Sequence, residues 1–274
     1  MSGAAPDGAD AFVGKWLAAE PWHRLLLLFE PPDRRAPRRL LETLGFELRQ
    51  AALAASDPRV SAAKLGWWAQ EWQALAAGAP RHPLTRALAA IAPFPAAAEP
   101  GGLAWLQAAA ALGQGHDDAT PAQRLARWQA FALAQAEAGT PWLPAPRATD
   151  ARAHGLALLA ESLPGLAAPA AAGHLVLPLS VLAAQGLVRA DLRASPPRPA
   201  LAAALAGFAG ELSGQIPPLL AGSGGYRHGQ LLLARRLLAA VAARPATAWQ
   251  GARMPPGPGA VLALWWSRRR DRRA

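Results

Sequence analysis

Residues 61–77 read SAAKLGWWAQEWQALAA, and Gly78 follows them directly. Leu65, Trp68 and Trp72 recur at intervals of three and four residues, which places them on one face of an α-helix. Glycine often follows the last turn of a helix, because it adopts a positive φ without strain. We therefore predict an amphipathic helix here that packs through a tryptophan-rich face.

The rest of the chain also has the composition of a helical protein. Of its 274 residues, 52% are hydrophobic and 17% are charged, and alanine and leucine far outnumber the β-branched residues that favour strands. Thr120-Pro121-Ala122-Gln123 forms a capping box that should open a helix reaching Ala138. We predict an all-α, single-domain helical bundle over 12–250, with a disordered tail over 1–11 and a Pro/Gly turn and basic tail over 251–274.

Proline and glycine clusters predict where the helices are interrupted. Pro31-Pro32 should stop the chain before a helix that begins near Ala36. We expect a small-residue connector over 165–173 and a further break over 217–225, which holds two prolines and several glycines.

Charge and cysteine content narrow the classes of function. The chain has no cysteine, which excludes disulfides, thiolate catalysis and cysteine-based metal sites. Its formal net charge is +10, almost all from arginine, because Lys15 and Lys64 are the only lysines. We interpret this charge as a solvated surface. The basic run over 267–273 leaves peripheral contact with an anionic membrane as an alternative, whereas no base-reading module points to nucleic acid.

The start of the chain lacks an apolar run of the signal-peptide type, and apolar stretches elsewhere are shorter than a membrane span requires. We therefore expect a cytoplasmic protein, with contact at the inner membrane as an option.

The acidic residues argue against metal-dependent chemistry. No two of them are four positions apart, the spacing at which successive helical turns present two carboxylates to one Mg²⁺. The sequence also lacks HExxH, GxSxG and the glycine-rich phosphate-binding motifs. We predict no metal ligands, no catalytic residues and no cofactor. The run His116-Asp117-Asp118, before the capping box, is interpreted as electrostatic support for a helix N-terminus.

Two segments resemble the squalene/phytoene synthase family. Residues 64–72, KLGWWAQEW, and 81–88, RHPLTRAL, are similar to the family pattern of a basic residue, Leu, a Trp-Trp pair with a nearby acid, a glycine-ended helix and then His-Pro. Residues 174–182, HLVLPLSVL, resemble the family's Gly-Arg-x-Tyr-Leu-Pro segment, with Gly173 in place and His174 and Val176 where Arg and Tyr are usual. The resemblance implies an isoprenoid synthase fold.

The same resemblance shows what this chain lacks. Family enzymes carry two aspartate-rich motifs that bind Mg²⁺ and so ionise prenyl diphosphates. Where the first motif is expected, this chain has Ala51, Ala52 and Ala55, and the aspartates of the second fall on Gly165 and Pro169. Both motifs are missing.

The pattern is closer to a degenerate branch of the family, which includes a mitochondrial factor implicated in assembly of respiratory complex I. The run 159–164, LAESLP, is similar to the corresponding run of that branch. We interpret the chain as a non-catalytic relative whose apolar cavity holds a prenyl or lipid ligand, or which acts on a protein partner. The residues expected to line or brace that cavity are Glu47, Lys64, Trp68, Glu71 and His82.

Two alternatives stay open. An active Mg²⁺-dependent prenyl transferase would need unusual metal ligands drawn from scattered acids such as Glu42, Glu47 and Asp117. A basic peripheral membrane protein would instead act through the arginine-rich tail.

Overall fold

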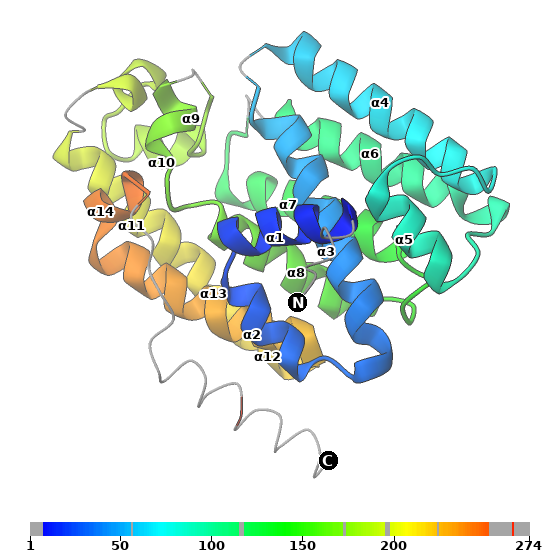
Figure 1. Cartoon of the computed structure of the whole chain (residues 1–274). Helices are drawn as coiled ribbons and strands as arrows, with labels where there is room; N and C mark the ends of the chain where they lie inside the picture. The colour runs from blue at the N-terminus through cyan, green and yellow to red at the C-terminus, as the bar shows by residue number, and fades with distance from the viewer. Residues whose placement is uncertain are drawn as a thin grey trace, which may run out of the picture. The chain divides into compact units, whose positions relative to one another are not determined.

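All regular elements in the described part of the chain are helical, as predicted from composition. The computed structural model describes residues 8–55, 57–114, 118–171, 174–194, 198–223, 225–251 and residue 265, and no strand occurs among them (Figure 1). None of the described helices is long and apolar enough to cross a membrane.

The helices divide into two compact units. Unit 1 comprises residues 1–112 and 133–146, and unit 2 comprises residues 113–132 and 147–274. The chain passes between the units three times: at the end of helix α6 (Glu99–Gly113), inside helix α7 (Pro121–Ala138) and in the segment that follows α7. Because each unit is built from separate stretches of the chain, no single linker in the sequence marks a boundary between them. The single domain over 12–250 stays a prediction.

Unit 1 begins with a helix that starts earlier than predicted. Its elements before α7 are α1 (Gly8–Ala19), α2 (Trp22–Phe29), α3 (Pro32–Leu53), α4 (Pro58–Ala76), α5 (Pro83–Ile91), the 3₁₀ turn η1 (Ala96–Ala98) and α6 (Glu99–Gly113). The predicted disordered tail over 1–11 is thus too long, because residues 8–11 are helical; residues 1–7 lie outside the described part. Ala9 and Val13 are buried, and the negative charge of Asp10 in the first turn interacts favourably with the positive end of the helix dipole.

Helix α3 is the centre of unit 1, where it packs against α1, α2, α4 and α5. It begins at Pro32 and not near Ala36. Proline is tolerated in the first helical turn, because the N–H group that it lacks would have no hydrogen-bond partner within the helix.

A cluster of large aromatic side chains fills the unit 1 core beside α4 and α6. Trp72 makes edge-to-face contacts with Phe94 and Trp105, at ring-centroid distances of 5.4 and 5.9 Å. The ring of Trp72 occupies the space where Gly102 lacks a side chain, since a Cβ there would lie 1.6 Å from Trp72 Nε1.

Unit 2 is built around α8, α11 and α13. Besides the first part of α7, its elements are α8 (Ala148–Glu161), α9 (Ala167–Ala171), α10 (Leu179–Ala183), the 3₁₀ turn η2 (Arg189–Arg193), α11 (Pro199–Gly214), α12 (Ile216–Gly222), α13 (Gly225–Ala243) and α14 (Pro245–Trp249). Helix α13 packs on α8 and on α11. Gly155 of α8 meets the backbone of α7, because its Cβ would lie 2.5 Å from Gln129 Cα.

Two of these helices correct the sequence predictions. Helix α9 occupies part of the predicted connector 165–173, and α12 occupies most of the predicted break 217–225. In α12 the prolines 217 and 218 stand in the first turn, where their missing N–H groups would be unpaired in any helix. The predicted arginine-rich tail over 267–273 lies outside the described residues.

Candidate functional site

A cavity of about 320 Å³ in unit 1 gathers most of the residues that the sequence singled out. Its lining comprises Lys15, Glu47, Gln50, Ala51, Ala54, Lys64, Trp67 and Trp68. Glu47, Lys64 and Trp68 belong to the predicted set, whereas Glu71 and His82 do not line the cavity. Sequence reasoning missed Lys15, Gln50 and Trp67 as site residues, although the rarity of lysine was a signal for Lys15.

Helical periodicity explains why these side chains converge. Helix α3 presents Glu47, Gln50 and Ala51 on one side, at intervals of three and four residues. Helix α4 presents Lys64, Trp67 and Trp68 at the same intervals, and α3 and α4 pack together. Lys15 reaches the cavity from α1, which packs on α3.

The charged groups of the cavity are unevenly paired. Lys15 Nζ lies 2.8 and 3.0 Å from the two carboxylate oxygens of Glu47, and it also lies 5.7 Å from the centre of the Phe46 ring. Among the described residues no ion pair of Lys64 is found. Two ammonium groups and one carboxylate thus leave the lining with one net positive charge.

An aromatic wall closes one side of the cavity. Trp67 is 43% exposed, whereas Trp68 is 7% exposed, so the pair presents one accessible and one buried indole. The ring of His82 supports both, with centroid distances of 5.7 Å to Trp67 and 4.7 Å to Trp68. Phe12 packs on the same imidazole at 4.5 Å. His82 therefore braces the wall from behind.

Glu71 holds His82 and the start of α5 in place. The Glu71 side chain is fully buried, and its Oε1 accepts hydrogen bonds from the backbone N–H groups of Arg81 and His82, both at 2.8 Å, and from the Thr85 hydroxyl. Burial alone would raise the pKa of Glu71, but the hydrogen bonds from Thr85, His82 and Arg81 outweigh burial and hold that pKa below its ordinary value. The carboxylate is ionised and structural.

His82 is held in its neutral form. Its Nδ1 accepts the backbone N–H of Leu84 at 3.2 Å, which caps α5 and requires an unprotonated nitrogen. Burial lowers the pKa of His82 below its ordinary value, although the negative charges of Glu71 and Glu47 oppose that shift. The side chain therefore acts as an aromatic and capping group at neutral pH.

The cavity does not fit the Mg²⁺ ions that the resemblance implies. Glu47 is the one acidic residue among the described lining residues, and Lys15 already neutralises it. Ala51 lines the cavity at a position where the resemblance places a metal-binding aspartate. Glu42 is buried with Arg38 Nη1 3.8 Å from its carboxylate, and Asp117 lies outside the described residues. These side chains offer no pair of free carboxylates to one cation.

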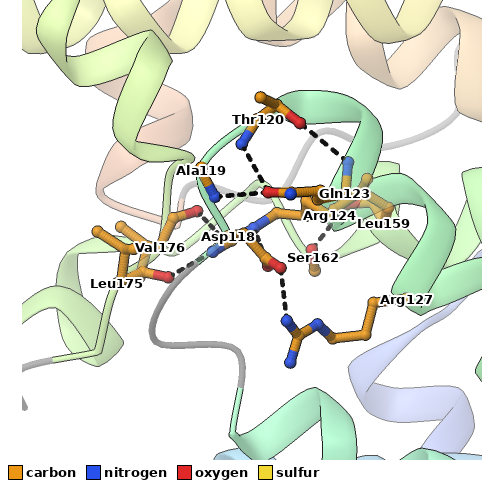
Figure 2. Close-up of polar contacts among 10 residues, drawn as sticks. All are labelled: Asp118, Ala119, Thr120, Gln123, Arg124, Arg127, Leu159, Ser162, Leu175 and Val176. Carbon is orange, nitrogen blue, oxygen red and sulfur yellow. Dashed lines mark hydrogen bonds and ion pairs between the residues drawn. The ribbon is translucent and has the colours of Figure 1, made fainter.

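The Leu-Pro segment of unit 2 is fixed by a buried arginine (Figure 2). Arg124 Nη1 and Nη2 donate to the backbone carbonyls of Val176 and Leu175, each at 2.8 Å, and Nε donates to Asp118 at 3.0 Å. Arg127 Nη2 donates to the same carboxylate at 2.7 Å. Asp118 is thus committed to two arginines and serves a structural role; His116 and Asp117 lie outside the described residues.

Comparison with solved structures defines the fold class. The chain is similar to a dehydrosqualene synthase whose crystal structure contains a ligand, with a TM-score of 0.71 over 97% of this chain and 97% of that chain, at 12% sequence identity. No protein-family model matches the sequence, and no curated protein matches it either. The structural likeness shows an all-α isoprenoid synthase fold, which confirms the predicted fold class.

Proposed function

We propose that this protein is a squalene/phytoene synthase-like protein that has retained the isoprenoid synthase fold without Mg²⁺-dependent catalysis, and that it binds a prenyl or lipid chain in the unit 1 cavity. One observation carries the proposal: Ala51 lines the cavity where a metal-binding aspartate is expected, while the acid nearby, Glu47, is paired with Lys15.

The chemistry of prenyl transfer explains why this substitution matters. Departure of diphosphate leaves several negative charges on the leaving group, and metal ions stabilise that charge as Lewis acids. Such ions need oxygen ligands at close to 2 Å with near-ideal octahedral geometry. An alanine supplies none, and a carboxylate held by an ammonium group does not replace it.

The remaining lining suits an apolar chain with a polar end. Ala51, Ala54 and the two indoles of Trp67 and Trp68 form the apolar part of the wall. Ligand sites are commonly concave and mostly apolar, with a few placed polar groups that fix orientation. Here Lys15, Lys64 and Glu47 are those groups. A protein partner, and membrane contact through 267–273, stay predictions.

Two assays on the purified protein test the proposal. Farnesyl and geranylgeranyl diphosphate are supplied with Mg²⁺ while diphosphate release is followed, with a dehydrosqualene synthase as positive control. Native mass spectrometry then looks for a bound C15 or C20 chain. We expect chain binding without diphosphate release. Diphosphate release that a chelator abolishes would overturn the non-catalytic assignment and support an active transferase.

A matched pair of variants locates the bound chain. Trp67→Ala removes an exposed part of the cavity wall, and we expect it to weaken binding of the chain several-fold. Leu133→Ala removes an exposed apolar side chain of α7 that does not line the cavity, and it should leave binding unchanged. Equal effects of the two substitutions would place the chain elsewhere.

A further inference from the structure

We propose that the unit 1 cavity selects an amphiphile with a singly charged carboxylate head group, an isoprenoid or fatty acid anion, and holds it without metal. The inference rests on the proposed function, because it takes the cavity as the ligand site. It differs from a prenyl diphosphate site in the charge of the ligand.

The charge of the lining limits the charge of its ligand. Lys15 and Lys64 contribute two positive charges and Glu47 one negative charge. A single carboxylate balances the excess, whereas a diphosphate brings further negative charge that this lining does not compensate. At the same time Glu47 repels additional anionic groups, since like charges a few ångströms apart interact unfavourably when water is partly excluded.

The use of lysine marks this cavity as a site for an anionic head group. The chain has 28 basic residues, of which only Lys15 and Lys64 are lysines, and both line this one cavity. An arginine guanidinium is a planar fork that suits bidentate phosphate or carboxylate binding, whereas the lysine ammonium is a compact charge on a flexible stem.

The position of Lys64 makes it the first contact. Lys15 is already held by Glu47, while Lys64 lies one turn before Trp68 and is exposed. A carboxylate bound to Lys64 would place the start of its hydrocarbon chain beside Trp67 and Trp68. The indoles provide apolar surface that is rigid before binding, because His82 packs behind both.

The size of the cavity favours a ligand with a single chain and a small head group. About 320 Å³ is at the lower end of the volumes of ligand pockets. A phospholipid with two acyl chains and a substituted phosphodiester head exceeds that volume. A single-chain carboxylate places its head and the first part of its chain inside.

Three probes with the same C15 chain test the inference: farnesol, farnesoate and farnesyl diphosphate, measured by isothermal titration calorimetry at pH 7 without divalent metal. We expect farnesoate to bind about tenfold more tightly than either of the others, the size of one charge-assisted hydrogen bond. Tightest binding of the diphosphate, or equal binding of farnesol and farnesoate, would overturn the inference and leave chain binding intact. Absence of binding by all three would overturn the proposed function itself.

Two charge variants show which residues carry the selectivity. Lys64→Gln should weaken farnesoate binding about tenfold and leave farnesol unchanged. Arg59→Gln makes the same charge change on α4 outside the cavity and should alter neither affinity. Glu47→Gln removes the repulsion and should improve binding of the diphosphate relative to farnesoate. An unchanged ratio of the diphosphate and farnesoate affinities in Glu47→Gln would refute the role of charge balance.

Discussion

Replacing Glu71 with alanine should destabilise His82 and the start of α5, which support the cavity wall, without changing any residue that lines the cavity. The substitution removes the acceptor of three donors: the N–H groups of exposed Arg81 and half-buried His82, and the hydroxyl of buried Thr85, which keeps the His82 carbonyl as a second partner. Leaving a buried donor without its acceptor typically costs about 1 to 3 kcal/mol, and because one of the three donors is exposed and another has a second acceptor, we expect a total loss of about 2 to 4 kcal/mol. Glu71→Gln keeps an acceptor oxygen and should cost about 1 to 2 kcal/mol.

Denaturant unfolding followed by circular dichroism measures the loss of stability, and amide hydrogen exchange locates it. In Glu71→Ala the amides of Arg81 and His82 should lose protection before those at the centre of α3. Glu137→Ala removes an exposed carboxylate of unit 1 and should change stability by less than about 0.5 kcal/mol. A cost under about 1 kcal/mol for Glu71→Ala, or unchanged exchange at both amides, would refute the bracing role.

Three further outcomes follow from contacts elsewhere in the two units. Gly102→Ala should cost about 3 kcal/mol by thermal denaturation, because its Cβ would overlap the Trp72 ring, whereas Gly66→Ala on the open side of α4 should be neutral or stabilising. Arg124→Gln should lower the free energy of unfolding by about 3 to 5 kcal/mol and speed amide hydrogen exchange at Leu179 and Ser180. Unchanged protection of these two amides would show that the arginine is dispensable. Acidification should destabilise the protein through His82, because folding lowers the pKa of this side chain. As the pH falls below about 6.5, the unfolded chain takes up the proton before the folded protein does. The stability that is present above that pH is therefore lost as the pH falls through the lower pKa of the folded state. His82→Asn, which keeps a helix-capping acceptor, should flatten this part of the pH profile; an unaltered profile would assign it to other groups.

Local signals in the sequence predicted much of the fold because they act within a few residues. The capping box is one example: Gln123 N–H donates to Thr120 Oγ1 and Thr120 N–H donates to Gln123 Oε1, both at 3.2 Å, and α7 starts at Pro121. Proline was the main source of error. At positions 217 and 218 the same residue type that ends a helix stands at the beginning of one, and the surrounding fold decides between the two.

The site was predictable in part for a different reason. Lys64 and Trp68 share a helix face, so their proximity follows from spacing alone. The ion pair between Lys15 and Glu47 joins residues 32 positions apart and depends on how α1 packs on α3, which no short pattern encodes. The role of Glu71 also depends on tertiary structure, because Arg81 and His82 lie 10 and 11 positions away, in the segment that joins α4 to α5.

The scarcity of lysine gives this protein a built-in chemical reporter. Apart from the chain terminus, its only primary amines are those of Lys15 and Lys64, and both border the same cavity. An amine-reactive reagent therefore modifies the molecule at that cavity and at no other side chain. The amine of Lys64 should react faster than that of Lys15, which Glu47 holds. Protection of these two amines, read by peptide mass, would report occupancy of the cavity in a crude extract, before any ligand has been identified.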